Sequence, residues 1–378
     1  MLSWPKSVFV LLIGGFLAIA AAHADPPVFN EDGFRIPTPH PVFSFPRDHG
    51  SHPEFRIEWW YITGHLRDEA QQRFGFQATF FRVGLTPHDE GQAQTSFGTN
   101  QLMMAHMALA DPAEKRFVHE ERLNREGWDA WARVDGLDLR NGNWTLVGEE
   151  DGVMTLVGSV LSDISFSLRL VPLKGPVLFG EGGLSRKGAS PSAASWYITF
   201  PRLKVAGHLD LNGETRSVIG EAWMDHEISS SQLAEDQVGW DWASLRLYDG
   251  REIMVYMLRR RDGTVDPAST LAWIDEQGGV HHFSSDAFSW QSQRSWKSPT
   301  TGGRYPLDIL LTAPRLEGEG TVPMLIRPLM DEQEMVGHLG GVSYWEGACE
   351  VLDAGGAVIG EAYMELTGYA EELTDALR

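Results

Sequence analysis

The chain has 378 residues, of which 42% are hydrophobic, and a formal net charge of −21 at pH 7. Such an acidic surface repels phosphate groups, so we expect no binding to nucleic acid, and an anionic membrane surface is disfavoured for the same reason. The only cysteine, Cys349, excludes an internal disulfide. Its charged neighbours Glu346 and Glu350 are acidic, so we expect a buried, unreactive thiol.

The first 24 residues predict a cleavable export signal. Lys6 is the only charged residue among them, residues 8–22 are almost entirely apolar, and Ala22-His23-Ala24 forms a small-x-small end. The apolar run is shorter than the about 20 residues of a membrane-spanning helix. We therefore expect cleavage before Asp25, an exported protein in the periplasm or outside the cell, and no stable membrane insertion after cleavage. An uncleaved anchor is the alternative.

Beyond the signal, apolar and polar residues alternate in many short segments. The clearest are residues 74–80 and 164–170, in which every second side chain is apolar. Successive side chains of a strand point to opposite faces, so this period predicts half-buried strands. Further strands are expected at residues 58–66, 102–111, 144–148, 195–200, 204–211, 218–224, 238–248, 253–259, 271–275, 305–311, 342–352 and 358–367.

Turn sequences such as Asn212-Gly213 and Asp249-Gly250 separate these segments. Only two short stretches, residues 111–122 and 371–378, favour a helix. Many short strands with frequent glycine turns are typical of antiparallel barrels or sandwiches.

An internal repeat indicates a duplicated β-domain. The segments VIGEAWM at 218–224 and VIGEAYM at 358–364 agree at six of seven positions. Each copy would be the closing strand of its own domain, although coincidence is the alternative. The polar stretch Ser229-Ser230-Ser231 then places a boundary near residues 228–238, with an N-terminal domain at 25–232 and a C-terminal domain at 233–378.

Three segments place carboxylates or histidines beside large aromatic rings. They are FPRDHG at 45–50 with EWWY at 58–61, AWMDHE at 222–227, and DQVGWDW at 236–242. On a strand, Trp240 and Trp242 share one face, and Asp241 lies on the opposite, apolar face. A carboxylate there must be paired or have a raised pKa, which suits a general acid near neutral pH. The alternatives are that the tryptophans form a core and that residues 48–50 and 225–227 are a turn and a strand end.

Metal and nucleophilic chemistry find little support. The sequence has no HExxH, CxxC or GxSxG motif, and His226 on a strand points away from Asp225 and Glu227. We expect no metal, no other cofactor and no protein partner.

The same segments, with Met104-Ala105-His106 and Leu173-Lys174-Gly175-Pro176, resemble the AttH-like family, which is related to carotenoid 1,2-hydratase (hydroxyneurosporene synthase). The resemblance covers roughly residues 40–370 with the motifs in order. It implies an all-β chain with two lipocalin-like antiparallel β-barrel domains in tandem and a site between or within the barrels. Members are often labelled secreted hydrolases, and wider relatives include fungal cyclases of polyenes. One departure is Ile228, where the family pattern has tryptophan, so the hydratase substrate does not carry over directly.

Residues and resemblance together predict an exported protein that binds an apolar polyene, terpenoid or lipid-like molecule. It would hydrate or isomerise a C=C bond by acid catalysis, with Asp225 and Asp241 as candidate acids and His226 holding the water. A non-catalytic carrier and a hydrolase of a lipid-like ester are the alternatives. The expected ligand-binding residues are His49, Glu58, Trp59, Trp60, Tyr61, His106, Glu227, Trp240 and Trp242.

Overall fold

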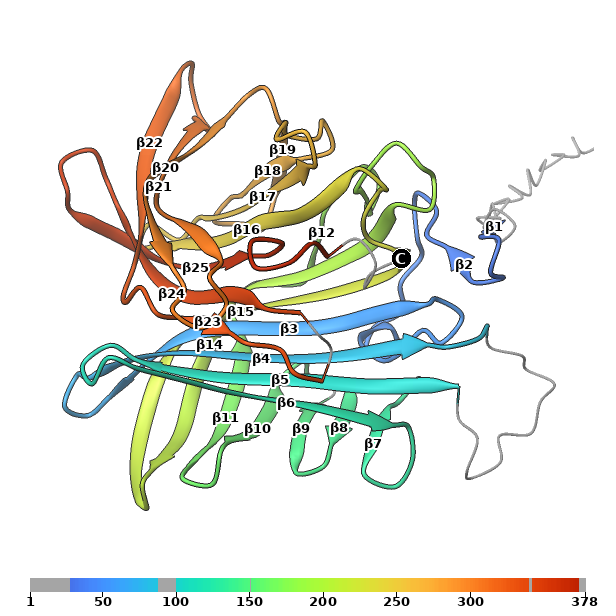
Figure 1. The fold of residues 1–378 in the computed structure, drawn as a ribbon, viewed down its shortest axis with the longest axis horizontal. Coiled ribbons are helices and arrows are strands. Elements are labelled where there is room, and N and C mark those ends of the chain that lie inside the picture. Colours follow the sequence, from blue (N-terminus) through green and yellow to red (C-terminus); the bar gives the residue numbers. More distant parts are fainter. Residues whose placement is uncertain (1–27, 88–99, 150, 340–341, 374–378) are drawn as a thin grey trace, which may run out of the picture.

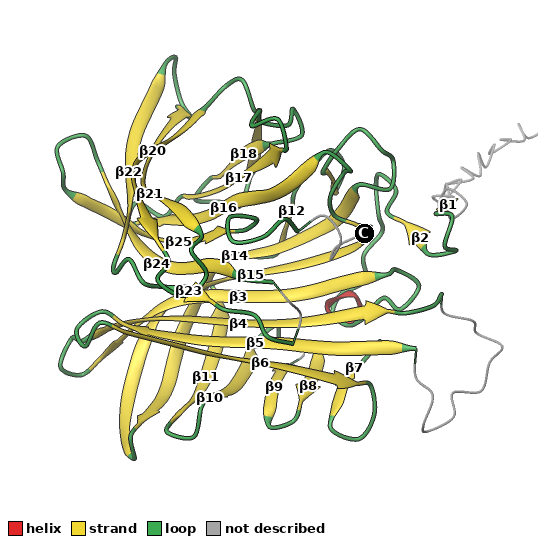
Figure 2. Ribbon diagram, in the orientation of Figure 1, coloured by secondary structure: helices red, strands yellow, loops and turns green. Residues whose placement is uncertain are grey.

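The structure is a computed structural model that describes residues 28–87, 100–149, 151–339 and 342–373. The export signal expected at residues 1–24 lies outside this range. Within it the regular secondary structure is all strand except for a single 3-10 turn, η1 (Arg47–His49) (Figure 2). The all-β expectation is confirmed. None of the described elements is a helix with the length and apolar character needed to cross a bilayer.

The first large sheet is antiparallel and follows the order β6-β5-β4-β3-β15-β14-β11-β10-β9-β8-β7, with β12 and β13 both paired to β14. Its strands are β3 (Ile57–Asp68), β4 (Arg73–Gly84), β5 (Gln101–Asp111), β6 (Arg116–Arg125), β7 (Ala130–Ala132), β8 (Asp138–Asn141), β9 (Trp144–Gly148), β10 (Met154–Val160), β11 (Ile164–Pro172), β12 (Val177–Leu178), β13 (Leu184–Arg186), β14 (Ala194–Leu211) and β15 (Glu214–Ser231).

The second large sheet is also antiparallel and follows the order β19-β18-β17-β16-β25-β24-β22-β21-β20, with β23 paired to β24. Its strands are β16 (Gln237–Leu247), β17 (Glu252–Arg260), β18 (Thr270–Ile274), β19 (Val280–Ser284), β20 (Ser289–Lys297), β21 (Arg304–Pro314), β22 (Thr321–Pro328), β23 (Glu334–Met335), β24 (Tyr344–Leu352) and β25 (Val358–Leu366). A short separate pair, β1 (Val28–Phe29) and β2 (Arg35–Ile36), precedes both sheets.

Each large sheet curls around a core of its own (Figure 1). In the first, the side-chain amide of Asn124 on β6, one end of the strand order, donates at 2.6 Å to Asn141 on β8, the strand next to the other end. In the second, the indole N–H of Trp273 on β18 donates to the carbonyl of Pro314 on β21 at 2.9 Å. The expectation of two lipocalin-like barrels is confirmed, and we call the two sheets barrel 1 and barrel 2.

The repeat occupies equivalent strands of the two barrels. Residues 218–224 lie in β15, which pairs with β3, the first long strand of barrel 1. Residues 358–364 lie in β25, which pairs with β16, the first strand of barrel 2. Each copy therefore ends its barrel against the strand that begins it. The chain passes from one sheet to the other between Ser231 and Gln237.

The outer faces of the barrels pack against each other where β3, β14 and β15 meet β16 and β17. A buried ion cluster fastens this joint. Glu252 of barrel 2 accepts hydrogen bonds from Lys174 at 2.6 Å and from Arg202 at 2.7 Å, both from barrel 1. Lys174 also donates to the carbonyls of Gly250 and Asp275. The LKGP motif therefore connects the two barrels.

The helix expected at residues 111–122 is wrong. Strand β5 ends at Asp111, and β6 begins at Arg116, which pairs with Asp111 across a tight turn. The charged residues that favoured a helix lie on an edge strand, where both faces stay partly exposed. Residues 371–373 are not helical, and the rest of the second expected helix lies outside the described residues.

Candidate functional site

A cavity of about 130 Å³ lies between the outer faces of the two barrels. It brings together seven residues expected from the sequence, namely Trp59, Tyr61, His106, Asp225, Glu227, Trp240 and Trp242. It also takes in residues that the sequence analysis did not single out for a site, chiefly Lys187, Tyr197, Tyr256, Tyr344, Glu346 and Glu365.

Strand alternation explains which residues reach the cavity. Trp60 points into the core of barrel 1, so Trp59 and Tyr61 point outward. Their cross-strand neighbours on β15 are Glu227 and Asp225, which therefore face the same way.

Asp225 is a carboxyl of the barrel 1 wall with three hydrogen-bond donors around it. It accepts hydrogen bonds from the hydroxyls of Tyr197 at 2.7 Å and Thr199 at 2.5 Å, and from the indole of Trp223 at 2.7 Å. Burial raises the pKa of Asp225 and these three donors lower it, so that the pKa lies at about 7. Asp225 can therefore gain or lose a proton near neutral pH.

Glu227 differs from Asp225 because it has a cationic partner. The ammonium of Lys187 lies 3.1 Å from its carboxylate, and the hydroxyl of Ser195 donates to it at 2.5 Å. The same ammonium lies over the rings of Tyr197 and Tyr256, at 4.7 and 4.2 Å from their centres. Burial alone would lower the pKa of Lys187, but the charge of Glu227 raises it, so Lys187 carries a positive charge at neutral pH.

Barrel 2 contributes two carboxyls to the opposite wall. Glu365 accepts a hydrogen bond from the indole of Trp240 at 2.8 Å, and Glu346 accepts one from the hydroxyl of Tyr61 at 2.9 Å. Burial raises the pKa of Glu365 to about 7 against the Trp240 hydrogen bond, with the charges of Glu227 and Asp225 adding to the rise. Burial and the charge of Glu365 together raise the pKa of Glu346 well above its usual range.

His106 is the one expected histidine that lines the cavity. Its Nδ1 lies 2.6 Å from the hydroxyl oxygen of Tyr344. Burial lowers the pKa of His106 to about 4, so the ring is neutral at pH 7. Its Nε2 is buried and has no hydrogen-bond partner among the described residues.

Four other expected residues lie on the inner side of barrel 1, away from the cavity. Glu58, Trp60 and His226 share the face of β3 and β15 that points inward, and the indole of Trp60 donates to the carbonyl of His49 at 2.9 Å. The ring of His226 stacks on Trp60 with centres 4.6 Å apart. The structure therefore separates His226, the expected water-holding residue, from Asp225.

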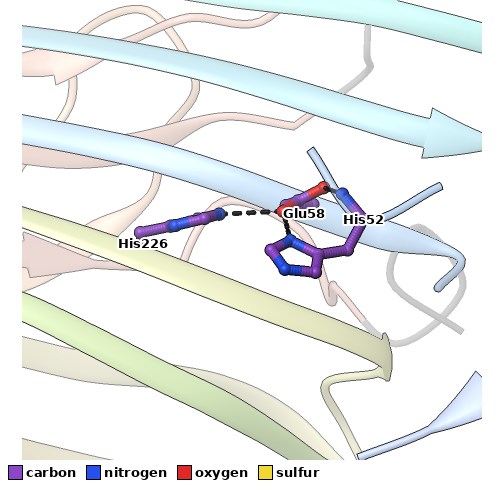
Figure 3. A group of neighbouring side chains, drawn as sticks. All are labelled: His52, Glu58 and His226. Carbon is purple, nitrogen blue, oxygen red and sulfur yellow. Dashed lines mark hydrogen bonds and ion pairs between the residues drawn. The ribbon is translucent and has the colours of Figure 1, made fainter. Parts of the chain in front are cut away.

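Glu58 is the centre of a buried ionic network (Figure 3). One carboxylate oxygen contacts His52 Nδ1 and His226 Nε2, both at 2.8 Å. The other accepts hydrogen bonds from Arg82 Nε at 3.0 Å and from the backbone N–H of His52 at 2.8 Å. Asp48 Oδ1 lies 3.2 Å from His52 Nε2. His52 thus bridges two carboxylates.

The spacing of His52, Glu58 and His226 would allow a metal ion, because one ligand atom from each lies within 4.8 Å of the others. Both ring nitrogens of His52 already contact carboxylates, however. Burial would lower the pKa of His52, but the charge of Glu58 and the hydrogen bond to Asp48 raise it to about 9. The protonated imidazole of His52 and the guanidinium of Arg82 therefore already provide the positive charge next to Glu58 that a metal ion would otherwise provide. The donor set therefore fits an ion-pair network better than a metal centre.

The stability contributed by His52 should depend on pH. Its pKa rises from 6.5 to about 9 on folding, so the contribution is complete below pH 6.5 and is lost as the pH rises through 9. The shift corresponds to about 3 kcal/mol. Urea unfolding of the wild type and of His52→Gln should show a larger difference in unfolding free energy at pH 6.5 than at pH 9.5. An equal difference at both values would contradict the ionised state of His52.

Asp241, the second candidate acid, lies outside the cavity lining. It points into barrel 2, where its carboxylate accepts hydrogen bonds from Arg259 at 3.0 Å, Tyr369 at 2.9 Å and Trp290 at 3.2 Å. Burial raises its pKa despite the charge of Arg259, as its place on an apolar face predicts. The structure does not bring Asp241 together with Asp225. Cys349 is buried with a raised pKa, in line with an unreactive thiol.

Comparison with known proteins places this arrangement in a family. The model of the AttH-like family matches residues 36–369. The crystal structure of an AttH-type protein from Nitrosomonas europaea is similar at 36% identity with a TM-score of 0.78, over 88% of this chain and 98% of that one. A comparison with curated protein sequences gave no match.

Two more distant structures share the fold. Kievitone hydratase from Nectria haematococca is similar at 14% identity with a TM-score of 0.65, over 91% of this chain and 98% of that one. CghA in complex with Sch210972 is similar at 12% identity with a TM-score of 0.51, over 84% and 90% of the two chains. The family match over most of the sequence, together with the close structural relative, shows that this chain belongs to the AttH-like family.

Proposed function

We propose that the cavity between the barrels binds an apolar molecule and adds water to one of its C=C bonds by acid catalysis. The observation that carries this proposal is a wall of aromatic rings that holds buried carboxyls, among them Asp225 with a pKa of about 7. A general acid or base works best when its pKa is near the working pH.

The aromatic rings suit the charge that such a reaction develops. Protonation of an alkene leaves a carbocation, and ring faces attract a cation by about 0.5–2 kcal/mol each. Trp59, Trp240 and Trp242 all line the cavity. They can stabilise the cation without forming a bond to it, while the carboxylates add favourable charge.

Hydrolysis of an ester fits this wall less well. That reaction places negative charge on a carbonyl oxygen, and enzymes stabilise it with hydrogen-bond donors or cations. Here the one ammonium described in the cavity, that of Lys187, is paired with Glu227. The excess of carboxyls favours a reaction that passes through a cation.

A distant relative supports the reaction class. Kievitone hydratase shares the fold, and its name describes the addition of water. At 14% identity the similarity concerns the fold, so the substrate of this chain follows from its own cavity: an uncharged, apolar molecule with a C=C bond.

Native mass spectrometry of the protein purified from its own periplasm tests the proposal. We expect a bound polyene, terpenoid or lipid-like compound that gains the mass of one water on incubation with fresh protein. A compound recovered unchanged would favour the carrier function. A polar or anionic compound would overturn the apolar cavity as the binding site.

We also propose that the protein acts outside the cytoplasm. The N-terminus of the protein recovered from the periplasm or medium should begin at Asp25, because the preceding small-x-small sequence is the form that signal peptidase cleaves. Mass determination of the intact protein checks this. Recovery of the full chain in the membrane fraction would instead indicate an uncleaved anchor.

A further inference from the structure

The repeat relates the two walls of the cavity. Asp225 follows the first copy directly and Glu365 follows the second, so they occupy the same place in β15 and β25. Both line the cavity. Their cross-strand neighbours correspond as well: Tyr61 on β3 and Trp242 on β16. The barrels thus meet through equivalent faces, and each brings a carboxyl to the joint.

Barrel 2 adds a second carboxyl beside the first. Glu346 on β24 is the direct cross-strand partner of Glu365 on β25. Side chains in such positions start about 4.5–5.5 Å apart, and like charges there repel. Neither glutamate has a lysine, arginine or histidine within ion-pair distance among the described residues, whereas Glu227 has Lys187. Two adjacent buried carboxyls without a cation cannot both remain charged.

We propose that Glu346, paired with Glu365, is the proton donor of the cavity and that Asp225 on the opposite wall receives the proton of the attacking water. The assignment rests on the hydration proposed above and names residues for its two proton transfers. It gives the donor to barrel 2 and the acceptor to barrel 1.

The hydrogen bonds of the two carboxyls differ in a way that fixes these roles. Both oxygens of Asp225 accept hydrogen bonds, which stabilise a carboxylate. In Glu346 only Oε2 accepts one, from Tyr61, and the buried Oε1 has no partner among the described residues. A proton on Oε1 is therefore left for a bound molecule. Once Glu346 has lost it, the hydroxyl of Tyr61 stabilises the carboxylate.

The reaction balances with water as the only added reactant. The O–H bond of Glu346 breaks, its proton forms a C–H bond with one alkene carbon, and the other carbon becomes cationic. Water forms a C–O bond with that carbon and gives a proton to Asp225. After the product leaves, solvent returns one proton to Glu346 and removes one from Asp225, so the net change is alkene plus water to alcohol.

The charge of the site also limits the substrate. Glu227 neutralises Lys187, and the remaining carboxyls are either neutral or negative. A carboxylate or phosphate group would meet repulsion here. The part of the substrate that enters the cavity must therefore be uncharged, and a substrate with an acidic head group would have to keep that group in the solvent.

Infrared titration of the free protein tests the donor without any substrate. Protonated carboxyls give a carbonyl band separate from that of carboxylates. We expect a band that persists at pH 8 and moves when the protein contains glutamate labelled with heavy carbon at its side-chain carboxyl. Glu346→Gln should remove the band. In Glu365→Gln the band should disappear at a lower pH than in the wild type, because the neighbouring negative charge that raises the pKa of Glu346 is absent.

Glu350→Gln is the matched control. Glu350 lies on the same strand face as Glu346 but pairs with Arg327 at 2.5 Å and does not line the cavity. This variant should keep the band. A band that is absent from the wild type at pH 8, or that Glu346→Gln leaves in place, would overturn the proposal. A wild-type band that does not move with the heavy-carbon label would also overturn the proposal. This measurement needs only the wild-type protein, so it is decisive even if a variant fails to fold.

Turnover separates this inference from the proposed function. With the compound that co-purifies with the protein, Glu346→Gln should lower conversion by about 10²–10⁴-fold, and Glu350→Gln should not. If the wild type itself leaves that compound unchanged, the proposed hydration fails whatever the infrared result. If the wild type converts it and Glu346→Gln does so equally well, only the donor assignment fails.

Discussion

Replacing Asp225 with asparagine is expected to lower turnover by about 10²–10⁴-fold, the range associated with loss of a general acid or base. Asparagine keeps the size of the side chain but cannot take up a proton. The measurement is conversion of the co-purifying compound, followed by mass spectrometry as addition of one water. Three hydrogen-bond donors surround this carboxyl, so unfolding by urea must be measured alongside.

Asp210→Asn is the control for that substitution. Asp210 lies on β14, the strand next to β15, but it is outside the cavity lining, where it accepts hydrogen bonds from Ser165 and Thr215. It should retain full turnover. If Asp225→Asn converts the compound as fast as the wild type does, Asp225 transfers no proton in the reaction.

The second large effect concerns stability. Glu58→Ala should lower the free energy of unfolding by about 3–5 kcal/mol, because it leaves two buried cationic groups, Arg82 and protonated His52, without their shared carboxylate. Urea unfolding near pH 7 measures this. Glu54→Ala should change the unfolding free energy by less than about 1 kcal/mol, since Glu54 forms a partly exposed pair with Arg35.

The unfolding of Glu58→Ala and Glu54→Ala distinguishes two roles for Glu58, ligand binding and stabilisation of barrel 1. The sequence suggested ligand binding because Glu58 precedes three aromatic residues. The structure places it inside barrel 1, outside the cavity lining, where His52, Arg82 and His226 contact its carboxylate. A stable Glu58→Ala variant that no longer retains the co-purifying compound would restore the ligand-binding role.

Strand periodicity predicted most of the fold because it is a local property. Residues 74–80 and 164–170 lie within β4 and β11, and the alternation also told which side chains of β3 share a face. The helix expected at 111–122 failed because charged residues are equally compatible with an edge strand, and pairing with β5 decides the matter. Such pairing depends on contacts that a local pattern does not contain.

The sequence predicted only part of the site, because contacts between distant strands decide which residues come together in the cavity. Asp225 and Trp59 stand in motifs that were singled out, whereas Glu346 was missed although it directly follows Tyr344 and Trp345, a carboxyl beside large aromatic rings. Glu365 could have been found, because it occupies the place of Asp225 in the second copy of the repeat. Asp241 was correctly placed on an apolar face, but the sequence does not say that this face belongs to the interior of barrel 2.

The cavity lies on the seam between two barrels, and each barrel has a complete core of its own. Side chains that line the seam can therefore change without disturbing the packing that holds either barrel together. The ion cluster of Lys174, Arg202 and Glu252 connects the two barrels away from these positions, so such substitutions leave this connection unchanged. Such an architecture can acquire new substrates by substitution at a few outward-facing positions, because the residues that line the cavity lie outside the cores of the two barrels.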